Sequence, residues 1–134
     1  MNHGDHRDHG GILFRELSEK VIGAAIEVHR SLGPGLLESV YESCLYLELL
    51  DSGIKVARQV EIPVTYKERP VDCAFRADLL IENAILIELK AVEKLLPIHD
   101  AQLLTYLKLA KLKVGLLINF NTTSLRNGIR RLVR

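Results

Sequence analysis

The sequence predicts an α/β fold in which a mixed β-sheet is flanked by helices. Three observations lead to this class. Apolar residues recur at helical spacing in two early segments and one late segment, they alternate in the segments between, and one short late run is almost entirely apolar. With 134 residues, of which 48% are hydrophobic and 26% charged, the chain can bury a core. We expect one domain over residues 13–134 and a flexible tail over residues 1–12.

Two amphipathic helices open the predicted domain. The first runs from Phe14 to Leu32, where apolar residues follow three- and four-residue steps. Gly33-Pro34-Gly35 then interrupts the helix, because proline cannot continue the hydrogen-bond ladder. The second helix is expected from Leu37 to Asp51, with Gly53 in the position of a C-terminal glycine.

Strands follow the two helices. Alternating side chains mark Lys55 to Tyr66, where Pro63 indicates an edge strand or a bulge, and residues 67–70 form a turn. The remaining elements are two strands near Val71–Ile81 and Ala84–Ala91, a helix over Pro97–Leu112, a doubly covered strand over Val114–Phe120, and a short basic helix over Arg126–Arg134. The order is therefore ααβββαβ(α).

Composition excludes several classes of protein. Eighteen Lys and Arg residues against seventeen Asp and Glu residues give a net charge of +1, too small for non-specific coating of polyanions. No apolar run approaches the ~18 residues that span a bilayer, and the start does not resemble a secretory signal. Cys44 and Cys73 are lone thiols, which we expect to be buried and reduced. These features favour a cytoplasmic protein with no membrane partner.

Two charged side chains interrupt the otherwise apolar third strand. Glu88 and Lys90 are two residues apart and share a face of the sheet. Burying them is costly unless they are paired, bind a metal or take part in chemistry. Asp78 of the preceding strand faces Glu88 if the intervening loop is the three residues 82–84. We expect this loop because Asn83 tolerates the dihedral angles that it needs.

Two carboxylates beside a lysine suit the hydrolysis of a phosphodiester. Carboxylate oxygens bind Mg²⁺ or Mn²⁺, and such an ion lowers the pKa of its bound water and offsets the phosphate charge. The ammonium group can orient the nucleophile or stabilise charge in the transition state. A lysine–carboxylate pair on a solvated face explains the bare spacing equally well.

Other candidates are ambiguous on their own. Gln102 and Tyr106 are four residues apart and share a helix face. Glu38 lies in the first turn of the second helix, where capping alone would explain it, and Glu42 reads as a plain surface charge. Arg76 has the strand parity of Asp78, so it holds either a phosphate or a neighbouring acid.

Gly35, Glu38 and Tyr41 form a G-x-x-E-x-x-Y motif. Through this motif and several longer segments, the chain resembles the GxxExxY protein family, which is grouped with the PD-(D/E)XK nuclease superfamily. The resemblance covers nearly the whole chain from about Leu13. Ala77 stands where a proline often precedes the motif aspartate, and Glu68 stands where the family usually has a glycine. The longer segments are residues 29–38, 75–78, 88–91, 102–106 and 115–120.

The resemblance implies a restriction-endonuclease-like αβββαβ core and a Mg²⁺- or Mn²⁺-dependent nuclease, with DNA favoured over RNA as substrate. It implies metal ligation by Asp78 and Glu88, assisted by Glu38. Lys90 would position or activate the attacking water. Arg76 is a candidate substrate contact on its strand parity alone, not through the resemblance. The implied catalytic residues are Glu38, Asp78, Glu88, Lys90, Gln102 and Tyr106.

The alternative is a non-catalytic nucleic-acid-binding or assembly module that retains the nuclease fold. Because the chain has no separate recognition domain and only 5% aromatic residues, a homodimer or a protein partner is expected to help it find its substrate. The Arg126–Arg134 cluster either guides a nucleic-acid backbone or forms a solvated helix. Histidines remain open as metal ligands: His29, and the N-terminal His3, His6 and His9. For His99 and Asp100, capping of a helix suffices.

Overall fold

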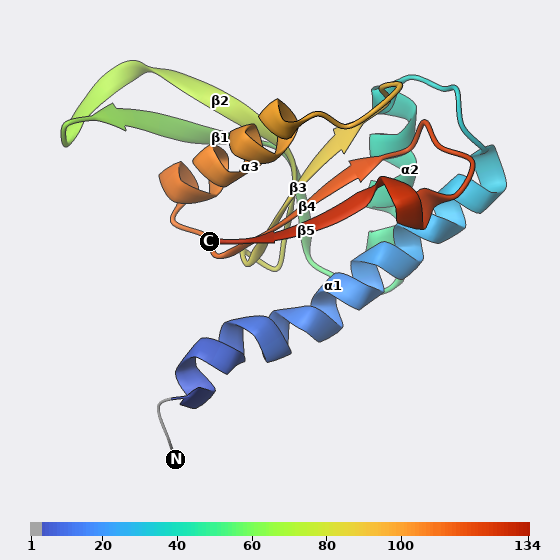
Figure 1. Cartoon of the computed structure of the whole chain (residues 1–134), viewed down its shortest axis with the longest axis horizontal. Coiled ribbons are helices and arrows are strands. Elements are labelled where there is room, and N and C mark those ends of the chain that lie inside the picture. Colours follow the sequence, from blue (N-terminus) through green and yellow to red (C-terminus); the bar gives the residue numbers. More distant parts are fainter. Residues whose placement is uncertain (1–3) are drawn as a thin grey trace.

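The computed structural model describes residues 4–134, and it confirms the α/β class with a mixed sheet. Five strands form one sheet in the order β1-β2-β3-β4-β5 (Figure 1). All neighbouring strands are antiparallel except β3 and β4, which are parallel. The elements are α1 (Gly4–Leu32), α2 (Glu38–Asp51), β1 (Val56–Tyr66), β2 (Arg69–Ile81), β3 (Ile85–Lys90), α3 (Pro97–Ala110), β4 (Val114–Asn119), η1 (Leu125–Gly128) and β5 (Ile129–Val133).

Helix α1 begins ten residues before the Phe14 at which the apolar stripe predicts its start. A helix that has already nucleated gains one hydrogen bond for each residue added, so it can extend past its packed face. The N-terminal end of α1 projects away from the sheet in Figure 1. Of the tail expected over residues 1–12, residues 1–3 lie outside the described part of the chain, and the backbone is helical from Gly4.

The sheet is covered on both faces. Helices α1 and α2 lie on one face, and α3 lies on the other (Figure 1). A hydrophobic core lies on each face of the sheet, and alternate residues of β3 point into one core or the other. Ile87 and Leu89 pack with α1 and α2, while Leu86 packs with α3. Glu88 has the parity of Leu86 and therefore belongs to the α3 side of the sheet.

Strands β1 and β2 continue past the rest of the sheet as a two-stranded ribbon (Figure 1). Its turn is formed by Lys67 and Glu68, whose φ angles of 50° and 65° are those of the hairpin turn that matches strand twist. The predicted irregularity at Pro63 is confirmed, because the register shifts between Pro63 and Thr65 on this edge strand. The expectation of a buried thiol is wrong for Cys73, which is exposed on the ribbon.

The basic C-terminal segment is a strand, so the helix expected over Arg126–Arg134 is wrong. After the short turn of η1, β5 pairs antiparallel with β4 and so completes its hydrogen bonds. Alternation sends neighbouring arginines to opposite faces: Arg130 pairs with Asp100 of α3, and Arg131 donates a hydrogen bond to Ser18 of α1. The arginines therefore do not form one helical basic face.

Candidate active site

The two motif carboxylates lie where β2 separates from β3. The predicted three-residue loop is confirmed, because Ile81 pairs with Ile85 and the register continues to Leu79 and Ile87. Glu82 and Asn83 both have positive φ angles, 52° and 55°, as such a loop requires. The next residues of the same register are Asp78 and Glu88, which the sequence predicts to face each other.

The carboxylates of Asp78 and Glu88 each accept a hydrogen bond from a backbone N–H of the opposite strand. The backbone N–H of Asp78 donates to Oε2 of Glu88 at 3.1 Å, and the N–H of Leu89 donates to Oδ2 of Asp78 at 2.7 Å. These side-chain oxygens take the place of backbone carbonyls at the end of the ladder, so both of these N–H groups have partners. Both carboxylates are consequently fixed in position.

Burial perturbs both carboxylates. Desolvation, together with the neighbouring charge of Asp78, raises the pKa of Glu88 to about 8, although the Asp78 N–H and Lys90 act in the opposite direction. The pKa of Asp78 is also raised, mainly by burial, despite the bond from Leu89; the nearby charge of Glu42 adds to this rise. Asp78 thus raises the pKa of Glu88, and the neighbouring acids Glu42 and Glu38 raise the pKa of Asp78, so a divalent cation would be stabilised here.

Lys90 extends the site along the same strand. It is the last residue of β3, two positions beyond Glu88 and therefore on the same face, and it is partly exposed. Its neighbour on β4 is Asn119, whose side-chain amide accepts a hydrogen bond from the Val92 N–H at 3.0 Å and donates to the Val92 carbonyl at 2.9 Å. Asn119, which the sequence did not single out, thus fixes the chain that leaves β3.

The G-x-x-E-x-x-Y residues place Glu38 at this end of the sheet. Gly35 has a φ of 97°, which favours glycine. The buried Tyr41 hydroxyl donates to the Gly33 carbonyl at 2.6 Å and accepts from the Leu36 N–H at 3.1 Å, so it fixes the loop before α2. Glu38 then begins α2, and its Oε2 accepts from the Ala91 N–H at 3.3 Å, directly after Lys90.

Helix α3 carries Gln102, which is exposed, and Tyr106, which packs against the sheet. The Tyr106 ring stacks on Phe75 of β2, with centroids 3.6 Å apart and an interplanar angle of 20°. The pKa of Tyr106 is raised, first by partial burial and then by the charges of Glu88 and Asp78, while the nearby Gln102 side chain acts in the opposite direction. The tyrosine therefore senses the charge of both carboxylates from the α3 side of the sheet.

Glu42 is not the surface charge that the sequence suggested, since it is only 8% exposed. Its Oε2 forms an ion pair with Arg58 at 3.2 Å, and its Oε1 accepts from the Gln59 side chain at 2.6 Å. Gln59 was missed altogether. The signal for Glu42 was its position one helical turn after Glu38, but no local pattern in the sequence marks Gln59.

Three other candidates have structural partners. Arg76 forms an exposed ion pair with Glu61 at 3.6 Å. Nε2 of the buried His29 lies 2.7 Å from the Thr122 carbonyl oxygen and so carries a proton, which favours the packing interpretation. His99 accepts from the Leu96 N–H at 2.9 Å and caps α3, as expected. Of the N-terminal histidines, His3 lies outside the described residues, and the side chains of His6 and His9 are likewise outside them.

The donor set fits a hard divalent cation. Among the side chains that the structure describes, no group of three or more His, Cys, Asp or Glu residues forms a ready-made metal cage. Mg²⁺ does not need one, because it keeps several waters and is usually held by one or two carboxylates and the substrate phosphates. Asp78 and Glu88 could supply such a pair.

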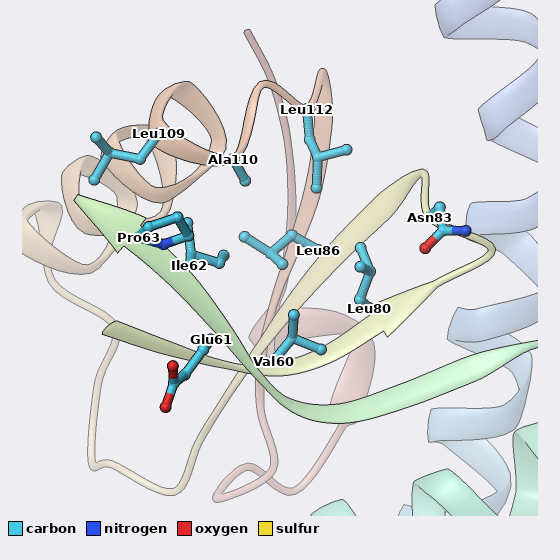
Figure 2. A pocket seen from close by; sticks show the side chains of 10 residues that line it. All are labelled: Val60, Glu61, Ile62, Pro63, Leu80, Asn83, Leu86, Leu109, Ala110 and Leu112. Carbon is cyan, nitrogen blue, oxygen red and sulfur yellow. The ribbon is translucent and has the colours of Figure 1, made fainter. Parts of the chain in front are cut away.

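A cavity of about 390 Å³ lies elsewhere on the α3 side, between the end of α3 and β1, β2 and β3. In Figure 2 the side chains of Ile62, Leu86 and Leu112 point into this space, whereas the Glu61 carboxylate points away from it. The motif carboxylates are not part of its lining. Over residues 4–134, no helix has both the length and the apolar character needed to cross a membrane.

Two comparisons with known proteins give matches. The family model of the PD-(D/E)XK nuclease superfamily matches residues 15–132. The solved structure titled "Crystal structure of SSO0001" is similar, with a TM-score of 0.56 and 22% sequence identity over 72% of this chain. The match spans 49% of that longer protein, and at this identity it shows the fold alone. A comparison with curated proteins gives no significant match.

Proposed function

Since the chain belongs to the PD-(D/E)XK nuclease superfamily, we propose that it hydrolyses phosphodiester bonds in DNA with the aid of Mg²⁺ or Mn²⁺. One observation carries the proposal. The carboxylates of Asp78 and Glu88 are each fixed by a hydrogen bond from the backbone of the other's strand, and Lys90 shares the sheet face of Glu88. A structural scaffold has no need for two carboxylates beside a lysine when burial destabilises their charged forms.

Each residue of the site has a role in this proposal. Asp78 and Glu88 would hold the metal, and Glu38 would assist from the start of α2. When bound, the ion would supply charge neutralisation at the phosphate and a water of lowered pKa. Lys90 would hold the attacking water or the phosphate oxygen by its ammonium group. The α3 pair, Gln102 and Tyr106, would orient the lysine and the substrate.

Substrate contacts outside the carboxylates are also proposed. Arg76 would exchange Glu61 for a substrate phosphate, because an exposed ion pair contributes little and is readily broken. The net charge of +1 gives weak non-specific attraction to DNA, so a homodimer or a protein partner would supply part of the recognition. We place the protein in the cytoplasm, where its free thiols would stay reduced.

The narrower family assignment is part of the same proposal. We assign the chain to the GxxExxY family within the superfamily, and we assign the site to a single domain over residues 13–134. The assignment is supported by the roles of the motif residues. Gly35 adopts a positive φ, Tyr41 fixes the preceding loop, and Glu38 lies next to the end of β3.

Calorimetric titration with Mn²⁺ tests the proposal directly. We expect the wild-type protein to bind Mn²⁺, and Asp78→Ala to weaken binding by at least about 10-fold, because half of the carboxylate pair is removed. Asp72→Ala, which removes an exposed aspartate of the same strand, is the control and should bind as the wild type does. Absence of binding at millimolar Mn²⁺ would favour the non-catalytic nucleic-acid-binding or assembly module.

A further inference from the structure

One side chain joins the metal-binding aspartate to helix α2. Nε2 of Gln59 donates to Oε1 of Glu42 at 2.6 Å and lies 3.4 Å from Oδ1 of Asp78. The other oxygen of Asp78 accepts from the Leu89 N–H. Gln59 and Leu89 therefore contact the two oxygens of the Asp78 carboxylate, one from β1 and one from β3.

Glu42 gives this contact a fixed anchor. It is 8% exposed, and Arg58 binds its other oxygen at 3.2 Å, so its position does not depend on Gln59 alone. The carboxylates of Glu42 and Asp78 repel each other. The neutral side-chain amide of Gln59 has two N–H donors and can donate a hydrogen bond to each of them. A side chain of the right length is needed to reach from one to the other.

The backbone of Gln59 is in an unusual conformation. Its φ angle is 49°, in the left-handed region that residues other than glycine and asparagine rarely adopt. It lies between the pairs Arg58–Leu79 and Val60–Ala77 of the β1–β2 register, directly opposite Asp78. Strain of this kind persists where the surrounding contacts require it, often at functional sites.

We propose that Gln59 is a positioning residue that holds the Asp78 carboxylate, from the anchored Glu42, in the orientation needed to ligate the metal. That Asp78 ligates a metal rests on the proposed function, whereas the orienting contact from Gln59 to Asp78 does not. Removing the amide would release Oδ1, leaving the Leu89 N–H as the contact that orients Asp78.

Two substitutions separate positioning from backbone strain. Gln59→Leu keeps the approximate size but removes the amide. Gln59→Asn keeps an amide and suits the positive φ better, but it is one methylene shorter and cannot bridge the two carboxylates. Glu68→Asn is the matched control, because it reduces the backbone strain at a residue with a positive φ of 65° in the distant β1–β2 turn.

The first measurement is made without metal. The amide proton of Leu89 reports the hydrogen bond to Asp78, and its NMR shift should move upfield in Gln59→Leu and Gln59→Asn but not in Glu68→Asn. The second is the dissociation constant for Mn²⁺, which should rise about 10-fold in both Gln59 variants.

An unchanged Leu89 signal in both Gln59 variants, or Mn²⁺ affinities within twofold of the wild type, would overturn the role of Gln59. Failure of the wild type to bind Mn²⁺ would instead contradict the proposed function, and the metal-free NMR comparison would still decide whether Gln59 orients Asp78. Should Gln59→Leu fail to fold, Gln59→Asn provides the same test with a more favourable backbone.

Discussion

Replacing Lys90 with alanine is expected to slow phosphodiester cleavage by about 100-fold or more while leaving Mn²⁺ affinity nearly unchanged. The ammonium group lies on the face of Glu88, where it can stabilise charge that develops in the transition state, and losing one such group commonly costs that much. Single-turnover cleavage at saturating Mn²⁺ measures the effect. Lys113→Ala is the control, since Lys113 is exposed at the opposite end of the sheet.

Two outcomes would contradict this role. Cleavage at the wild-type rate by Lys90→Ala would remove the lysine from the mechanism. An equal loss of cleavage and of Mn²⁺ affinity would mean that Lys90 acts by maintaining the carboxylates, because Lys90 lowers the pKa of Glu88.

Glu88→Gln should change the pH dependence of stability in the metal-free protein. Burial and the charge of Asp78 raise the pKa of Glu88 from 4.5 to about 8 in the folded state. A carboxyl group with a raised pKa binds its proton more tightly when folded. Its stabilising contribution is therefore complete below about pH 4.5 and is lost as the pH rises through about 8.

The wild-type protein should therefore lose stability between pH 5 and pH 9, and Glu88→Gln should lose less. At pH 9 we expect the variant to have the larger free energy of unfolding, by roughly 2–4 kcal/mol, with little difference at pH 5. Urea denaturation in the presence of a chelator measures this, with Glu93→Gln, an exposed glutamate, as the control. An equal difference in the free energy of unfolding between the two proteins at pH 5 and pH 9 would show that the pKa of Glu88 is not raised in the folded state.

Addition of Mn²⁺ extends the same comparison. A ligand that binds only the folded state raises its stability by mass action. Mn²⁺ should therefore restore the stability of the wild-type protein at pH 9, where Glu88 is charged, and should have a smaller effect on Glu88→Gln.

The centre of the site could be predicted from the sequence because its geometry is local. The short β2–β3 loop and the two-residue period of strands determine which side chains face each other, and Asn83 indicates the loop length. Once that loop is known, Asp78 and Glu88 must meet, and Lys90 must follow on the same face. No information about distant parts of the chain is required.

The surroundings of the site depend on contacts that local patterns do not encode. Gln59 combines a positive φ with a hydrogen bond to Glu42 on α2, and this contact between distant segments leaves no local pattern in the sequence. The arginines of β5 fit helical spacing as well as strand alternation, and the free edge of β4 decides between them. The early start of α1 likewise reflects extension of a helix beyond its apolar stripe.

Cleavage of a labelled panel of single- and double-stranded DNA and RNA with Mn²⁺, by the wild-type and Lys90→Ala proteins in parallel, tests the proposed nuclease most directly. The proposed function predicts that the wild-type protein cleaves at least one DNA substrate and that Lys90→Ala leaves it intact over the same time. A folded wild-type protein that cleaves nothing in the panel, or a Lys90→Ala protein that cleaves as fast, would contradict the assignment of these residues to a nuclease site.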